Sequence, residues 1–366
     1  MRPENEEELS GMVRAAASPL RIMGGGTRDI GKPLTGAALS MSAMSGITLY
    51  EPGALTLVAR AGTPLADVEE ALAHEGQRLA FEPPDMRALL STQGVPSVGG
   101  MVAANASGPR RVQAGACRDS LIGVRFVDGT GAAIKNGGRV MKNVTGYDLV
   151  KLMAGSWGTL GILTECSFKL LPVPETQATL CSAPMSIEDA GKVMSAAMGT
   201  PYEVTGAART PDGHVYLRVE GFERQVAYRC GQLRDVLGGA WDILDAPASA
   251  AQWRGIRDVR AFAECTGDVW RISLQPSAAP VVLARGDWPV IMDWAGGLLW
   301  VLTPEGVDLR AQLGEFAGHA TLVRGSQVTR TRLSVFPPQS PPLAAISQGI
   351  RQKFDPRGVL NPGLTG

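Results

Sequence analysis

The chain has 366 residues and a formal net charge of zero, and 45% of its residues are hydrophobic. At about 150 residues per domain, this length predicts about two domains with full cores. The balanced charge argues against a nucleic-acid or membrane-surface partner, because such binders need a basic face, and no apolar run reaches the ~18 residues of a membrane-spanning helix.

The first part of the chain predicts short helices and strands joined by glycine-rich loops. In the first helix, Leu9, Val13 and Ala16 fall on one face, and acidic residues occupy the first turn. Pro172 and Pro174 follow a long apolar strand and predict a domain boundary. In chain order, the expected elements are helix Glu4–Ala17, strands Leu20–Met23, Ile47–Tyr50 and Leu55–Arg60, helices Leu65–Glu75 and Ser97–Asn105, strand Val124–Val127, helix Tyr147–Met153 and strand Gly161–Leu170.

The second part of the chain predicts an antiparallel sheet with helices on one side. The stretch Val335–Pro342 contains four prolines and is typical of a linker. No internal repeat is visible in the residues. The expected elements are helices Ile187–Met198 and Glu223–Leu237, strands His214–Glu220, Val269–Leu274, Val290–Asp293 and Leu298–Leu302, and a final helix Leu343–Phe354.

The first glycine segment, Gly24-Gly25-Gly26-Thr27-Arg28-Asp29, follows a strand. Three residues without a Cβ let successive amide groups point into one concavity, which suits an anionic oxygen. The segment is not a Rossmann fingerprint, because Gly31–Gly36 contains Pro33 and cannot start the long helix that this motif needs. The ordinary alternative is a flexible surface loop.

The second glycine segment runs from Pro96 to Gly108. Ser97 can cap a helix whose first turn contains Gly99 and Gly100, and a helix N-terminus offers free N–H donors to a phosphate. The alternative is a glycine-rich helix that packs tightly against another element.

The third segment, Gly155–Glu165, predicts a tight turn that leads into a strand. The edge of such a strand could hold an adenine through backbone hydrogen bonds and through apolar contact with Ile162. A plain turn is the alternative.

Together the three segments are more specific than any one of them. Their order and separations resemble the pyrophosphate loop, glycine helix and adenine strand of FAD-binding domains of the vanillyl-alcohol-oxidase (PCMH) type. The block at 142–149 and the tail Asn361-Pro362-Gly363 resemble the same family. The resemblance implies an α+β fold with a two-subdomain FAD-binding domain at 1–172, an α+β cap domain with an antiparallel sheet at 173–335, and a C-terminal segment at 336–366 that returns to the first domain.

The residues that match the family's cofactor-binding segments are candidate FAD contacts. They are Gly24, Gly25, Gly26, Thr27, Arg28, Asp29, Pro96, Ser97, Gly99, Gly100, Ala103, Asn105, Ser107, Gly108, Asp119, Tyr147, Gly158, Gly161, Ile162 and Asn361.

More narrowly, the chain resembles the E subunits of bacterial glycolate oxidases, through segments such as Trp253–Arg257, Trp270–Leu274 and Asp293–Trp300. This resemblance implies an FAD-bearing subunit of a complex that oxidises glycolate to glyoxylate, with a D-type catalytic flavoprotein and an iron–sulfur subunit as partners. The alternatives are a stand-alone FAD oxidoreductase of another small hydroxy acid or alcohol, and a non-catalytic scaffold that binds FAD only for folding.

The first loop departs from relatives that attach FAD covalently, because Gly26-Thr27-Arg28 contains no histidine. We therefore expect non-covalent FAD. Cys117 is the other residue that could attach a flavin, but a free cysteine is usually a small buried apolar residue.

The chain also departs from the D-type relatives, which use clustered histidines to bind a metal and the 2-hydroxy acid. His74, His214 and His319 are far apart in the sequence, so we expect no metal site and find no evident catalytic base.

Two weak candidates for catalytic residues remain. Alternation in His214–Glu220 places His214, Tyr216, Arg218 and Glu220 on one face, which is either the solvent side of the sheet or the lining of a substrate pocket. Arg271 alternates with apolar neighbours, and its guanidinium suits a carboxylate.

The five cysteines are widely spaced and form no CxxC pair, and Met1–Leu9 is acidic without an apolar signal region. These features predict a cytoplasmic chain with reduced thiols that approaches a membrane only through its partners. Without a cluster of its own, the chain would have to pass electrons to a partner.

Overall fold

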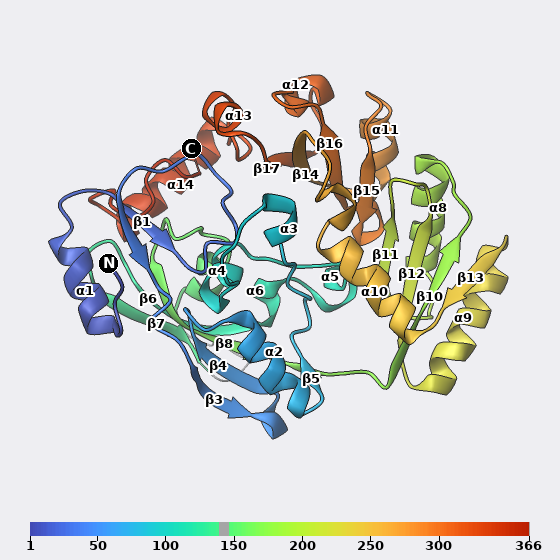
Figure 1. Cartoon of the computed structure of the whole chain (residues 1–366), viewed down its shortest axis with the longest axis horizontal. Helices are drawn as coiled ribbons and strands as arrows, with labels where there is room; N and C mark the ends of the chain where they lie inside the picture. The colour runs from blue at the N-terminus through green and yellow to red at the C-terminus, as the bar shows by residue number, and fades with distance from the viewer. Residues whose placement is uncertain (139–145, 366) are drawn as a thin grey trace.

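The computed structural model describes residues 1–138 and 146–365. Figure 1 shows two lobes side by side, with strands β1 to β8 and the C-terminal helix α14 in one lobe and strands β10 to β17 in the other. Both chain ends lie on the first lobe. The predicted α+β class is confirmed.

The first lobe is built on a five-stranded antiparallel sheet in the order β3-β4-β8-β6-β7. Strand β8 lies at its centre and is buried on both faces, because the helices pack apolar side chains such as Leu72 and Val102 against it. The elements are β3 Ile47–Glu51, β4 Thr56–Arg60, β6 Leu121–Val127, β7 Ala133–Gly137 and β8 Ile162–Lys169, with helices α2 Leu65–His74, α4 Val98–Ala103 and α7 Leu149–Met153.

A smaller layer joins the two chain ends. Helix α1 (Glu6–Ala15) begins at Asn5, whose Oδ1 accepts a hydrogen bond from the Glu8 amide at 2.9 Å. The parallel strands β1 (Leu20–Met23) and β2 (Ala37–Ser40) follow, and Leu360 forms a parallel bridge to Leu20. The C-terminal tail is therefore part of this layer.

The remaining elements of the first lobe are short. The two-residue strands β5 (Gln77–Arg78) and β9 (Leu171–Pro172) pair with each other. The other helices are α3 Arg87–Leu90, α5 Arg111–Ala114, α6 Cys117–Ser120, α13 Gln327–Arg332 and α14 Pro341–Phe354.

The second lobe contains an eight-stranded sheet in the order β13-β10-β12-β11-β15-β16-β14-β17. The topology repeats: each half is a β-α-β-β-α-β unit, and the two units meet at their second strands. The first unit comprises β10 Thr176–Ser182, α8 Ile187–Met198, β11 Val204–Arg209, β12 Val215–Gly221, α9 Glu223–Leu237 and β13 Trp241–Leu244. The second comprises β14 Asp268–Leu274, α11 Ala279–Leu283, β15 Val290–Asp293, β16 Leu298–Thr303, α12 Leu309–Leu313 and β17 Gly318–Arg324.

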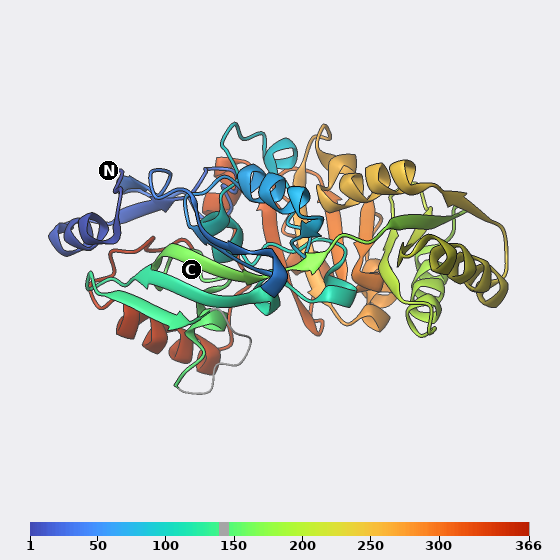
Figure 2. The ribbon, with the colours of Figure 1, turned by 90° about the horizontal axis from the view of Figure 1, so that it is seen from below.

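Helix α10 (Ala246–Arg257) connects the two units, and it corrects the expectation that helices cover only one side of the sheet. Figure 2 shows it across the face of the sheet opposite α8 and α9. Its Trp253 packs on Gly206 of β11, where a Cβ would lie 2.8 Å from the indole. Both faces of the first unit are therefore covered.

Candidate functional site

The first glycine segment crosses Gly94 and Val95, the residues that directly precede the second segment. The Val95 amide donates a hydrogen bond to the Gly25 carbonyl at 3.0 Å, and a Cβ at Gly25 would lie 1.4 Å from the Val95 carbonyl oxygen. On the other side of the crossing, a Cβ at Gly94 would lie 1.8 Å from the Gly25 carbonyl oxygen. The first loop is therefore held in place by this stretch, with a glycine on each side where the backbones touch.

The start of α4 completes this crossing. Ser97 Oγ accepts a hydrogen bond from the Gly100 amide at 3.4 Å, and a Cβ at Gly24 would meet that oxygen at 2.5 Å. Gly99 packs against Ala61, and its amide donates a hydrogen bond to the Ala61 carbonyl at 2.7 Å.

Two glycines of the crossing keep an open side. A Cβ at Gly100 would have only Ser97 Oγ nearby, at 3.2 Å, and a Cβ at Gly26 would have nothing within 4 Å. Gly26 also has a φ of +69°, which favours glycine. The open sides of Gly26 and Gly100, beside the first amides of α4, fit an anionic group such as a pyrophosphate. We name this arrangement of 24–27 and 94–100 the glycine cradle.

The third segment is bonded to the end of α4. The amides of Gly155 and Trp157 donate hydrogen bonds to the carbonyls of Val102 and Ala103, at 3.0 and 2.9 Å. Asn361 joins them, because its Nδ2 donates to the Trp157 carbonyl at 3.0 Å while its Oδ1 accepts from the Ile22 amide at 2.8 Å. The structure thus brings the three glycine segments and the tail together.

A cavity of about 800 Å³ opens beside the third segment. Its walls are the turn at 155–160, the stretch at 334–339, helix α14 and the tail at Leu364 and Thr365. Ser156 Oγ is buried with no hydrogen-bond partner among the described residues. An unpartnered buried hydroxyl beside a large cavity fits a polar ligand such as the adenosine half of FAD.

Ile162 is buried in the core beneath this segment, 1% exposed, among Leu9, Val13 and Leu20. Its side chain therefore packs in the core and cannot contact an adenine. Only the backbone groups of this strand are available to one. Gly161 is needed for packing, because a Cβ there would lie 2.5 Å from the Phe126 ring.

Several other candidate residues hold the protein's own backbone. Asn105 Oδ1 accepts from the Arg118 amide at 3.0 Å, Ser107 Oγ accepts from the Cys117 amide at 2.9 Å, and Asp119 Oδ2 accepts from the Ala116 amide at 2.8 Å. These side chains hold the first amides of α6. The Gly108 amide in turn donates to the Phe81 carbonyl at 2.8 Å.

Arg28 and Asp29 are tied to neighbouring segments. Arg28 Nη2 donates to the Pro84 carbonyl at 2.6 Å, and Arg330 of α13 forms an ion pair with Asp29 at 3.0 Å. The Tyr147 side chain is 87% exposed beside the edge strand β7. The preceding part of that family-like block, residues 142–145, lies outside the described residues.

The polar face of β12 is neither solvent-exposed nor an open pocket, which corrects both expectations. Arg218 is 1% exposed and Glu220 is 7% exposed, and both pair with residues of the first lobe. Glu220 accepts from Arg110 at 2.7 and 2.9 Å and from Arg78 at 2.8 Å, and Arg218 donates to Glu82 at 2.8 and 2.9 Å. We name these five residues the interdomain ion-pair cluster.

The cluster keeps its carboxylates ionised. Burial alone would raise the pKa of Glu220, but Arg218, Arg110 and Arg78 outweigh it and hold that pKa well below its usual range. The pKa of Glu82 is lowered for the same reason, by Arg218 and Arg110 against burial.

The structure separates the two catalytic candidates. The His214 ring contacts the Ser182 carbonyl through Nδ1 at 2.6 Å, at the opposite end of β12 from Glu220, roughly 20 Å away along the strand. Arg271 lies instead beside Trp294, with its guanidinium carbon 5.3 Å from the ring centroid.

Sequence reasoning missed the proximity of two residues, Arg111 and Asp293, to Arg271. Arg111 covers the same Trp294 ring at 4.4 Å, and Asp293 is 2% exposed, with Oδ1 accepting from the Trp294 amide at 2.7 Å. Burial raises the pKa of Asp293 to about 7. The segment Asp293–Trp300 was prominent in the sequence, but its pattern did not indicate that it faces Arg111.

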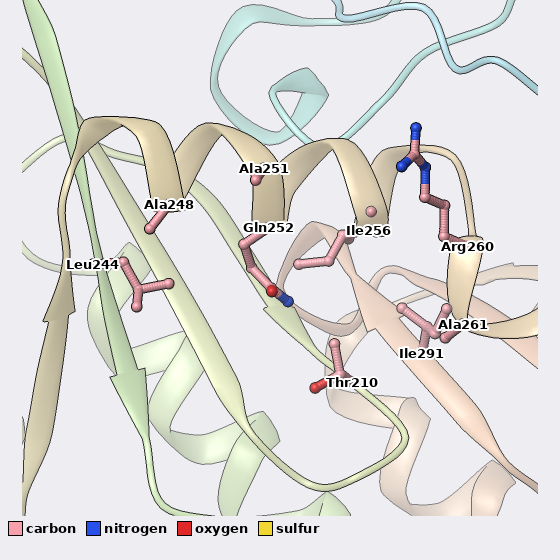
Figure 3. A pocket seen from close by; sticks show the side chains of 10 residues that line it. Thr210, Leu244, Ala248, Ala251, Gln252, Ile256, Arg260, Ala261 and Ile291 are labelled. Atoms are coloured by element: carbon pink, nitrogen blue, oxygen red, sulfur yellow. The ribbon is translucent and has the colours of Figure 1, made fainter.

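The second lobe has a separate cavity of about 520 Å³ under α10 (Figure 3). Its lining is mostly apolar, with Leu244, Ile256 and Ile291 around Thr210 and Gln252, and Arg260 points away from it. It lies near the single pairing of β11 with β15, Arg209 with Met292. It offers no group that could take part in redox chemistry.

Among residues 1–138 and 146–365, no three His, Cys, Asp or Glu side chains lie close enough to hold a metal ion, and no helix is long and apolar enough to cross a membrane. All five cysteines are unpaired, and burial raises the pKa of the fully buried Cys117 well above its usual value.

Comparisons with known proteins identify an FAD-binding domain in the first part of the chain. Residues 1–137 match the family model described as "FAD binding domain". Solved structures of similar fold include 4-ethylphenol oxidase from Gulosibacter chungangensis, with a TM-score of 0.71 at 15% identity over 100% of this chain and 88% of that chain. An alkyldihydroxyacetonephosphate synthase gives a TM-score of 0.70 at 15% identity over 99% and 75% of the two chains.

The fold and the glycine cradle define an FAD-binding flavoprotein of the oxidoreductase class. Among curated proteins, the glycolate oxidase subunit GlcE of Escherichia coli (strain K12) is 36% identical over 94% of this chain and 92% of its own length. The chain belongs to the family of glycolate oxidase subunit GlcE. Glycolate oxidase subunit GlcD of Bacillus subtilis (strain 168) is 33% identical over 53% of this chain and 41% of its own length.

Proposed function

We propose that the chain binds one FAD non-covalently, with the pyrophosphate in the glycine cradle and the adenosine half beside the third segment. The open sides of Gly26 and Gly100 carry this proposal, because the other glycines of the cradle are closed by protein atoms. The loop Gly26-Thr27-Arg28 offers no histidine for a covalent bond, and the fully buried Cys117 thiol is a poor nucleophile.

We infer that the chain serves as the FAD-bearing subunit of a glycolate oxidase complex that converts glycolate to glyoxylate. The support is its membership of the GlcE family and its partial similarity to GlcD. A D-type flavoprotein would be the catalytic partner. An iron–sulfur subunit would accept the electrons, because the cysteines of this chain are unpaired and spread from Cys117 to Cys265.

Bound FAD would supply a two-electron oxidant. The residues of this chain would hold and orient it, and the interdomain ion-pair cluster would fix the second lobe over the first. Removing hydride from a 2-hydroxy acid also needs a base near the hydroxyl, worth about 10²–10⁴ in rate. The histidine–metal group that would supply it has no counterpart among the described residues. We therefore propose that the isolated chain oxidises glycolate poorly.

Acid precipitation of the purified chain should release one equivalent of yellow flavin into the supernatant, because no residue of the cradle can bond to it covalently. The measurement is the absorbance of supernatant and pellet after precipitation, with Cys117→Ala alongside. Flavin that stays in the wild-type pellet but is released from Cys117→Ala would identify a covalent bond at Cys117. A chain that binds no flavin when FAD is supplied would overturn the cofactor proposal itself.

A further inference from the structure

Two arginines from different lobes lie over the ring of Trp294. The guanidinium carbon of Arg111, on α5, is 4.4 Å from the ring centroid, and that of Arg271, on β14, is 5.3 Å away. The indole is held in place, because its Nε1 donates to the Gly108 carbonyl at 3.0 Å. Trp294 also adopts a φ of +53°, a strained conformation that the surrounding structure has to maintain.

These two arginines differ from the other stacked arginines of the chain. Arg218 covers Trp253 at 4.6 Å but is paired with Glu82, and Arg310 covers Trp270 at 5.0 Å but donates to the carbonyls of Ala320 and Phe336. Within the described residues, neither the Arg111 nor the Arg271 guanidinium has a hydrogen bond or an ion pair. Five N–H donors on each side chain are therefore available to a ligand.

The local charge is positive and only partly neutralised, because Asp119 acts on Arg111, beside Arg118, and Asp293 acts on Arg271. Burial, and then the nearby Arg111 cation, lower the pKa of Arg271 to about 10. Asp293 is the carboxyl group that acts on Arg271, but burial raises its own pKa to about 7, so it is only about half ionised near neutral pH. His319, whose pKa is lowered by burial and then by Arg271 and Arg111, also faces the pair.

The Arg111–Arg271 pair can be reached from solvent beside strands β14 and β17. In the register of β14 with β17, Ser273 lies opposite His319 and Arg271 opposite Thr321. His319 is exposed, and Arg271, Ser273 and Thr321 are partly exposed. A small anion can therefore reach the guanidinium groups from this side.

We propose that Arg111 and Arg271 form a binding site for a small carboxylate anion, with the Trp294 indole as its floor. Two guanidinium groups can each form paired hydrogen bonds to a planar carboxylate, which fits beside a flat indole better than a tetrahedral phosphate does. Because Gly108 ends the second glycine segment and bonds to Trp294, the site borders the cofactor-binding segment. The assignment of a hydroxy-acid carboxylate rests on the proposed function.

The test is anaerobic calorimetric titration of the FAD-loaded chain with glycolate, acetate and inorganic phosphate. The wild-type chain is expected to bind glycolate and acetate. Its affinity for phosphate is expected to be at least tenfold lower. Arg271→Gln and Arg111→Gln are each expected to weaken glycolate binding by about tenfold or more, as expected for losing hydrogen bonds to a charged group. Arg271→Lys keeps the positive charge but loses the paired N–H donors of the guanidinium. Its affinity for glycolate should lie between those of wild type and Arg271→Gln.

The control is Arg224→Gln, which removes the same charge from an exposed position of α9 and should leave glycolate binding unchanged. FAD content and melting temperature are measured on every variant, so that a misfolded protein is recognised. Unchanged glycolate binding in folded Arg271→Gln and Arg111→Gln would overturn the site, as would the absence of binding in wild type. Phosphate bound as tightly as glycolate would overturn the carboxylate assignment. Any of these results with FAD still bound would leave the proposed function standing.

Discussion

Gly100→Val is expected to abolish FAD binding while the chain still folds. The added Cβ would have only Ser97 Oγ nearby, and the side chain would extend into the space that we assign to the pyrophosphate. Overpacking costs typically about 1–3 kcal/mol, which weakens binding by roughly 5- to 150-fold, and the loss of close approach to the phosphates adds to it. FAD affinity is measured by quenching of flavin fluorescence, and folding by circular dichroism.

Two further variants sharpen this experiment. Gly11→Val places the same side chain on a helix glycine with no atom within 4 Å, and should leave FAD affinity unchanged. Gly25→Val should also lose FAD, but for a different reason: its Cβ would overlap the Val95 carbonyl. We therefore expect a lower melting temperature for this variant as well. FAD affinity within a few-fold of wild type in both Gly100→Val and Gly25→Val would contradict our placement of the phosphate.

Glu220→Ala is expected to destabilise the chain by about 3–5 kcal/mol, because it leaves three arginines of the interdomain ion-pair cluster without their shared carboxylate. Urea unfolding monitored by tryptophan fluorescence measures the loss. We also expect the second lobe to unfold separately from the first, since the cluster is a direct link between them.

The matched control is Glu188→Ala, which removes an exposed ion pair with Lys192 on α8, where both side chains are about two-thirds exposed. Such an exposed pair contributes little to stability, because water screens the two charges. Equal losses in Glu220→Ala and Glu188→Ala would show that the buried cluster does not stabilise the contact between the lobes.

The helix start at Ser97 could be predicted from the sequence because a serine cap acts on its own helix. The crossing of Gly25 with Val95 could not, because the two residues are far apart in the chain. The long apolar strand was also predictable, since β8 extends over Ile162–Lys169 within the expected Gly161–Leu170.

The partners of the polar residues could not be predicted. Alternation showed that Arg218 and Glu220 share a face of β12, but it could not show that residues 136 and 110 positions away in the chain cover that face. The neighbours Arg110 and Arg111 diverge, one into the ion-pair cluster and one onto Trp294, because they begin a helix of only four residues. Helices this short have no periodicity to detect.

The repeated topology of the second lobe was also invisible in the residues. Each half needs only strands and helices in the same order, each with a buried apolar face. Different apolar residues can form these faces, such as Leu217 in β12 and Val301 in β16. Packing accepts many sequences of similar volume, so a structural repeat leaves no residue-level repeat.

The central claim is that this chain carries FAD for a complex and does not oxidise glycolate efficiently alone. The most direct measurement is anaerobic mixing of the FAD-loaded chain with excess glycolate, following flavin bleaching and glyoxylate formation, first alone and then with the D-type subunit. We predict slow or absent bleaching of the isolated chain and glyoxylate formation only in the complex. Rapid bleaching of the isolated chain would contradict the account and establish a stand-alone enzyme.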